Sequence, residues 1–137
     1  MPFNYDVFIS YRHVEPDRGW TRDVLVPRLE AGGLSVCIDI QCFRLGVPVI
    51  TEMERAVQES RYTLAILSPA YLAGGFTELE NLMADHLGIE ERGRRLIALM
   101  REQCEPRLGI RFRTWLDMTD DAEFEVNTRR LIGELSN

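Results

Sequence analysis

Short apolar segments rich in β-branched residues alternate with helical patterns along the chain, and this order restricts the possible folds more than any other feature. Five of these segments predict strands, at residues 5–10, 34–38, 62–67, 96–100 and, more weakly, 113–116. The third and fourth are apolar throughout, which is typical of strands buried on both faces. Repeated strand–helix–strand units predict parallel strands joined by right-handed crossovers. We therefore predict an α/β fold with a five-stranded parallel sheet and helices on both of its faces.

Helical patterns occupy the segments between the predicted strands. Apolar residues recur at helical spacing in four places: Trp20, Val24, Leu25 and Leu29; Ile50, Met53, Ala56 and Val57; Leu79, Leu82, Met83 and His86; and Phe124, Leu131, Ile132 and Leu135. Gly32 and Gly33 end the first helix, because glycine is favoured where a helix terminates. Pro27 lies inside the same pattern and lacks the N–H that a helix interior needs, so we predict a kink or a break there.

The order of the elements also predicts where a ligand would bind. Five parallel strands with helices on both faces give a flavodoxin-like sheet, and such sheets bind ligands at the carboxyl ends of their strands, near the point where the strand order reverses. The segments expected at that edge are residues 10–19, 39–48, 68–77 and 101–112.

Length and charge exclude several classes of function. The 137 residues suit one domain, which we place at residues 1–137 and expect to be the N-terminal part of a longer protein. The net charge of −6 argues against nucleic acid as a partner. No apolar run approaches the roughly 18 residues that a membrane span needs, and no signal peptide is visible. All 16 basic residues are arginine, so a P-loop lysine and a Schiff-base lysine are both excluded.

The three cysteines, Cys37, Cys42 and Cys104, are odd in number and have no metal-like spacing. We predict that all three are reduced thiols in a reducing compartment, with Cys37 a small buried residue of a strand.

Four motifs follow one another along the chain and together cover most of it. Tyr5 to Arg12 reads YDVFISYR, residues 34–39 precede a loop that ends in Gly46, residues 64–72 read LAILSPAYL, and residues 76–80 read FTELE. In this order and at this spacing, they resemble the first three strands, the BB loop and the glutamate motif of Toll/interleukin-1 receptor (TIR) domains. The resemblance implies the TIR fold in a cytoplasmic protein.

The resemblance implies one of two functions. Some TIR domains cleave NAD⁺ at the nicotinamide–ribose bond, and the glutamate they use aligns with Glu80. Nicotinamide leaves as a neutral molecule, so one carboxylate that stabilises the cationic transition state can suffice without a general acid, a metal or a cofactor beyond NAD⁺ as substrate. The local pattern has a structural alternative, because Thr77 and Glu80 also form a capping box at a helix start. Glu78 is a rival carboxylate in the first turn.

The resemblance also suggests which residues line the pocket. Ser10 resembles a pocket residue of the family, although a hydroxyl there can also bond the backbone of a turn. Arg12 could hold a pyrophosphate, or could form a surface ion pair. Asp39 could order the pocket or the loop beyond it, or could cap a turn.

The loop after the second strand contributes three further candidates, Phe43, Arg44 and Gly46. Phe43 could stack on nicotinamide or could pack against a neighbouring subunit. Gly46 is expected to supply a positive φ. Phe76 stands where the family usually has tryptophan, and a phenyl ring can still form a wall of the pocket.

Two interpretations therefore stand beside each other. The first is a bacterial NAD⁺ glycohydrolase that releases nicotinamide and ADP-ribose, or a cyclic variant, as an anti-phage immune effector; the arginine-only composition favours a bacterial source. The second is a TIR scaffold that acts in signalling by self-association without turnover. Glu80 favours the enzyme.

Overall fold

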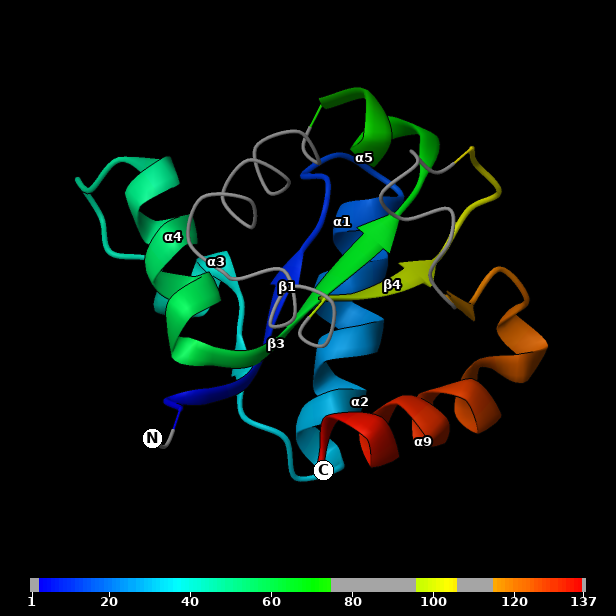
Figure 1. The fold of residues 1–137 in the computed structure, drawn as a ribbon. Helices are drawn as coiled ribbons and strands as arrows, with labels where there is room; N and C mark the ends of the chain where they lie inside the picture. The colour runs from blue at the N-terminus through cyan, green and yellow to red at the C-terminus, as the bar shows by residue number, and fades with distance from the viewer. Residues whose placement is uncertain (1–2, 75–95, 106–114, 137) are drawn as a thin grey trace.

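The computed structural model describes residues 3–74, 96–105 and 115–136. Within them lies one parallel sheet of five strands in the order β2-β1-β3-β4-β5. The strands are β1 (Tyr5–Ser10), β2 (Val36–Cys37), β3 (Ser60–Leu67), β4 (Leu96–Met100) and β5 (Leu116–Asp117). The predicted α/β fold is confirmed (Figure 1). The order reverses between β1 and β3, and this is the point where such sheets bind ligands.

Helices cover both faces of the sheet (Figure 1). On one face lie α1 (Asp17–Gly19), the π-helix η1 (Trp20–Leu25), α2 (Val26–Ala31) and α9 (Phe124–Leu135), and on the other lie α4 (Val49–Glu59) and α5 (Pro69–Gly74). Two short helices, α3 (Asp39–Cys42) and η2 (Asp121–Glu123), follow β2 and β5.

Successive strand residues point to opposite faces, and this divides the core in two. In β1, Val7 and Ile9 pack with Leu25 and Leu29 on the α2 side, whereas Phe8 packs on the α4 side. The same alternation recurs in β3 and β4. These strands are buried on both faces, as the continuous apolar segments predict.

The first helix is broken, as Pro27 predicts. Because Pro27 has no N–H to donate to the preceding turn, the chain forms a π-helical segment up to Leu25 and resumes as an α-helix at Val26. The wider π turn changes the buried face. Val24, which belongs to the same apolar pattern, is 43% exposed, while Trp20, Leu25 and Leu29 are buried.

The cysteine prediction is wrong for two of the three residues. Cys37 and Cys42 form a disulfide, and Cys104 is a thiol. β2 ends at Cys37, and the single turn of α3 brings Cys42 back until the two Cα atoms are 5.9 Å apart, within the usual range for a disulfide. Sequence spacing did not reveal this turn.

Two other sequence predictions differ slightly from the structure. The second strand is shorter than predicted, because α3 begins at Asp39. Ile50, predicted to face the core, is 47% exposed near the start of α4, although Met53, Ala56 and Val57 are buried. None of the described helices is long and apolar enough to cross a membrane.

Candidate functional site

A pocket of about 380 Å³ opens at the carboxyl end of β1, beside the reversal of strand order. It is enclosed by the end of β1, the segment that follows it, α3 and the first half of α4. Its lining residues are Phe8, Ile9, Ser10, Tyr11, Arg12, His13, Val14, Asp39, Phe43, Val49 and Met53. Two of the four segments predicted to contain the binding site, residues 10–19 and 39–48, therefore meet here.

Asp39 presents an oriented carboxylate at this pocket. The Tyr11 hydroxyl donates to Asp39 Oδ1 at 2.6 Å and accepts a hydrogen bond from Arg22 Nε at 2.7 Å. Asp39 Oδ2 lies 3.7 Å from Arg22 Nη2 and 3.6 Å from His13 Nε2. Burial and the bond to Asp39 raise the pKa of Tyr11, so the hydroxyl keeps the proton that it donates. This arrangement supports the prediction that Asp39 orders the pocket.

Ser10 and Arg12 both line the pocket, but their polar groups differ in availability. The Ser10 hydroxyl is buried and bonded to the Tyr71 hydroxyl at 2.8 Å, so it joins β1 to α5. This bond is not the predicted bond to a turn backbone, and the role of Ser10 as a pocket residue stays a prediction. The Arg12 guanidinium lies against Gly74, where an added Cβ would come within 2.9 Å of Arg12 Cζ. Among the residues that the structure describes, no carboxylate lies within ion-pair distance of Arg12.

Phe43 lines the pocket and also packs onto the protein's own core. Its ring stacks on Phe8, with the centroids 6.0 Å apart and the planes at 26°. One edge of the pocket wall is therefore an aromatic pair from β1 and the loop.

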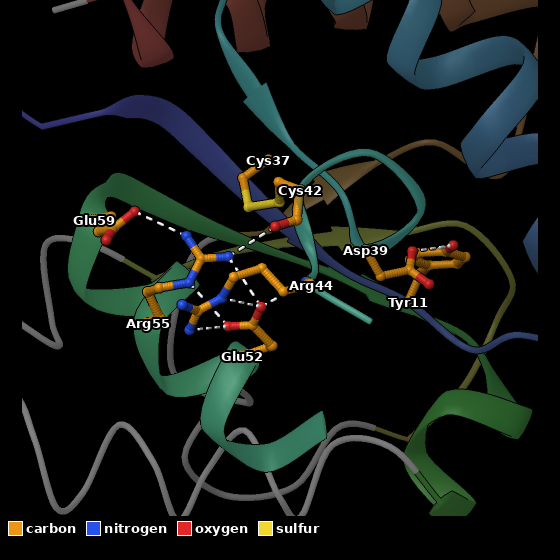
Figure 2. The surroundings of a disulfide bond; sticks show 8 residues. All are labelled: Tyr11, Cys37, Asp39, Cys42, Arg44, Glu52, Arg55 and Glu59. Atoms are coloured by element: carbon orange, nitrogen blue, oxygen red, sulfur yellow. Dashed lines mark hydrogen bonds and ion pairs between the residues drawn. A yellow bond between two sulfur atoms is a disulfide. The ribbon is translucent and has the colours of Figure 1, made fainter. Parts of the chain in front are cut away.

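Arg44 forms an ion-pair cluster with Glu52 and Arg55 of α4 (Figure 2). Glu52, whose side chain is 1% exposed, accepts the Arg44 backbone N–H at 2.5 Å and Arg44 Nε at 3.0 Å. Arg55 Nε also donates to Glu52 at 2.9 Å. These bonds, chiefly those from the Arg44 side chain, hold the pKa of Glu52 well below its usual range. Arg44 therefore fastens the loop to α4, and its role as a ligand group stays a prediction.

Gly46 has φ +82°, as predicted, in the left-handed region that glycine favours. Glu80 and Phe76 lie outside the described residues, as do Thr77, Glu78 and His86. Gly74, the last described residue before that segment, lies beside the Arg12 guanidinium.

Two groups of polar residues had no clear sequence signal. Arg22 extends from the π-helix to two pocket residues, and only the folded chain shows that it donates to Tyr11 and lies beside Asp39. Just beyond the carboxyl ends of β3 and β4, the Ser68 hydroxyl donates to the buried Asp17, and burial together with a hydrogen bond to Asp17 raises the pKa of Glu102. Among the described residues, no group of three or more histidine, cysteine, aspartate or glutamate side chains could hold a metal.

Comparisons with known proteins find sequence similarity to Toll and Toll-like receptors. A family model described as the TIR domain matches residues 7–132. Protein toll of Drosophila melanogaster is 26% identical over 148 residues, which cover 97% of this chain and 13% of that protein. Toll-like receptor 12 of Mus musculus is 36% identical over 90 residues, which cover 62% of this chain and 10% of that protein. This chain therefore spans a small part of the length of these receptors.

A solved structure of a TIR domain has a similar fold. The TIR domain of the Toll-related receptor TRR-2 from Hydra magnipapillata superposes with a TM-score of 0.81 at 24% identity, over 98% of this chain and 100% of that one. The relatives named here are animal proteins, and they do not support the bacterial subtype that the composition suggests.

Proposed function

The chain belongs to the TIR domain family, and we propose that it is an NAD⁺ glycohydrolase that cleaves the nicotinamide–ribose bond in the cytoplasm as an immune effector. The observation that carries the proposal is the pocket at the carboxyl end of β1. Its volume of about 380 Å³ lies in the range of small-molecule sites, roughly 300–1,000 Å³. Apolar and aromatic walls surround a few polar groups there, and this is the usual composition of such sites.

In the proposed reaction, water adds to C1′ of the ribose as the C–N bond to nicotinamide breaks. Nicotinamide leaves with the bonding electron pair as a neutral molecule, the water loses one proton, and ADP-ribose is formed. In the cyclic variant, a group of the ADP-ribose moiety takes the place of water. Glu80 would stabilise the positive charge that develops on the ribose.

The described residues would bind and orient the substrate. Arg12 carries a positive charge at the pocket without a described carboxylate partner, which suits the pyrophosphate. Asp39, fixed by Tyr11, could accept hydrogen bonds from ribose hydroxyls. Phe43 offers an aromatic face to a planar ring.

The direct test is nicotinamide release from NAD⁺ by the protein held at high density on beads. Glu80→Gln should abolish release, because glutamine lacks the negative charge but keeps the capping ability that the sequence predicts for this position. Glu30→Gln, at an exposed position near the end of α2, is the matched control and should behave as the wild type. Release by Glu80→Gln at the wild-type rate would exclude Glu80 as the catalytic residue.

A second test concerns binding. Arg12→Gln should raise the KM for NAD⁺ by about tenfold to a hundredfold, because it removes hydrogen bonds to a charged group worth about 1.5–3 kcal/mol. An unchanged KM in an active enzyme would place the pyrophosphate elsewhere.

A second candidate function is self-association in signalling, and a different observation favours it. The loop and the start of α4 expose four large apolar residues: Ile40 at 57%, Leu45 at 100%, Val49 at 63% and Ile50 at 47%. Exposed apolar groups near one another often mark protein contacts. The animal receptors among the relatives favour this role.

Light scattering distinguishes the two candidates. Leu45→Glu should reduce self-association, whereas Val126→Glu, at a position 60% exposed on α9, should not. Assembly by the wild type without nicotinamide release would favour the scaffold. Equal assembly by Leu45→Glu and the wild type would exclude this surface.

A further inference from the structure

The Cys37–Cys42 disulfide closes a short loop of the chain, residues 37–42 (Figure 2). Asp39, which lines the pocket, is one of the residues in this loop. Cys37 is fully buried in β2 and packs in the core beside α4. Cys42, at the end of α3, is half-buried. The disulfide therefore joins the core to the start of the loop that lines the pocket.

Cys42 is also where the loop meets α4. Its carbonyl oxygen accepts a hydrogen bond from Arg55 Nη2 at 2.7 Å. Arg55 binds Glu52, which in turn accepts the backbone N–H of Arg44. Two consecutive parts of the loop are thus held, residue 42 by a covalent bond and residue 44 by an ionic cluster (Figure 2).

The fold does not need this disulfide. A chain of 137 residues can bury roughly two-thirds of its unfolded surface without a covalent staple. β2 is held to β1 by its own pairing, Val36 with Val7 and Cys37 with Phe8. In compartments that keep thiols reduced, the disulfides that do form are usually transient, and many are redox-sensing.

We propose that Cys37–Cys42 is a thiol–disulfide exchange site for small thiols of the glutathione class, and that its oxidation state decides how tightly residues 39–44 are held at the pocket. The proposal does not depend on NAD⁺ cleavage.

The chemistry is a two-step exchange. A thiolate attacks Cys42 Sγ, because Cys37 is fully buried and Cys42 is not. Cys37 leaves as a thiolate and takes up a proton, and Cys42 then carries a mixed disulfide. A second thiolate attacks the outer sulfur of that mixed disulfide and releases the Cys42 thiol. Two molecules of glutathione are oxidised to one glutathione disulfide, and in the reverse direction glutathione disulfide is the oxidant.

Reduction should loosen the loop locally and leave the sheet intact. The cysteines are five residues apart, and the chain-entropy relation for a ring of this size predicts that amide exchange in residues 40–44 rises by roughly tenfold or more when it opens. The Arg44–Glu52 and Arg55–Cys42 hydrogen bonds remain available, so the loop should keep its average position. Asp39 would lose the ring that limits its backbone but keep its bond from Tyr11.

The experiment uses the whole chain carrying Cys104→Ser, which removes the third thiol. Comparison with the wild type shows whether Cys104 affects the exchange. The protein is equilibrated with mixtures of reduced and oxidised glutathione, alkylated, and mapped by peptide mass spectrometry. Hydrogen exchange is measured on the same samples. We expect reversible interconversion, a mixed disulfide on Cys42 rather than Cys37, and faster exchange in residues 40–44 of the reduced form only.

Three results would overturn the proposal. The disulfide could persist in the folded protein under excess glutathione, which would make it a permanent staple. It could fail to form under excess glutathione disulfide. Reduction could leave exchange in residues 40–44 unchanged. Cys42→Ser should reproduce the reduced state, and the reduced wild type gives the same information should that variant fail to fold.

Discussion

Replacing Tyr11 with phenylalanine tests the hydrogen-bonded group that orients Asp39. The change keeps the ring and removes only the hydroxyl, which donates to Asp39 at 2.6 Å and accepts from Arg22 at 2.7 Å. Hydrogen bonds to charged groups contribute about 1.5–3 kcal/mol to stability. The side chains of Arg22 and Asp39 are 27% and 20% exposed, so water can partly replace the lost partner. We therefore expect the lower part of that range, about 1.5–2 kcal/mol.

Thermal unfolding measures this loss. Unfolding entropy of about 2.1 cal/mol/K per residue converts about 1.5–2 kcal/mol into a fall in Tm of about 5–7 °C for a chain of this length. Tyr5→Phe is the matched control, because Tyr5 is half-buried at the start of β1, the strand that Tyr11 directly follows, and its hydroxyl makes no hydrogen bond with the part of the chain that the structure describes. Its Tm should stay near that of the wild type.

A double-mutant cycle assigns the loss to the pair. Asp39→Asn keeps an acceptor but removes the charge, so Tyr11→Phe should cost less in its presence, by about 1 kcal/mol. Equal Tm values for Tyr11→Phe and Tyr5→Phe would refute the reasoning, and so would strict additivity with Asp39→Asn.

The remaining predictions concern pH, backbone and core. Burial, and after it the hydrogen bond to Asp17, raises the pKa of Glu102 in the folded protein. A raised carboxyl pKa contributes stability at pH values below the pKa of the unfolded chain, about 4.3, and this stability is lost as the pH rises through the folded pKa. Glu102→Gln should therefore gain stability relative to the wild type between about pH 4 and pH 7, and equal urea midpoints across that range would contradict this. Gly46→Ala should lower stability by about 1–2 kcal/mol, because φ is +82° there. Gly133→Ala, at an exposed position within α9, should raise stability by up to about 1 kcal/mol, because alanine favours the helix more than glycine does. The changes in Tm of the two variants should therefore have opposite signs. Leu29→Ala should cost about 2–5 kcal/mol in urea unfolding, because its side chain is fully buried, and a loss below about 1 kcal/mol would mean that the core collapses around the gap.

The pocket and the loop concern both candidate functions. The loop supplies Phe43 to the pocket wall and carries Leu45, the fully exposed apolar residue, a few positions away. A substrate in the pocket and a partner on the loop would therefore contact the same short segment. Because the segment is fastened at residues 42 and 44, its position is set by groups in the core and on α4.

Several features were predictable because their causes are local. Apolar continuity identified β3 and β4, because a strand covered on both faces has no polar side to show. Pro27 predicted the break in the first helix, because it removes one particular hydrogen-bond donor. Gly46 predicted a positive φ, and the order of strands and helices predicted the edge of the sheet where the pocket lies.

The tertiary structure alone decided which side chains meet. Ser10 bonds Tyr71, which is 61 residues away, so its hydroxyl has a partner within the protein that the sequence did not reveal. Arg44 pairs with Glu52, and Cys42 reaches Cys37 only because α3 turns the chain back. A residue type states which bonds a side chain can make, whereas the partner depends on the distance and direction that the whole fold imposes. The sequence by itself therefore determined the architecture and the edge of the sheet where the pocket lies, and the packing of distant segments determined which partners the predicted polar groups have there.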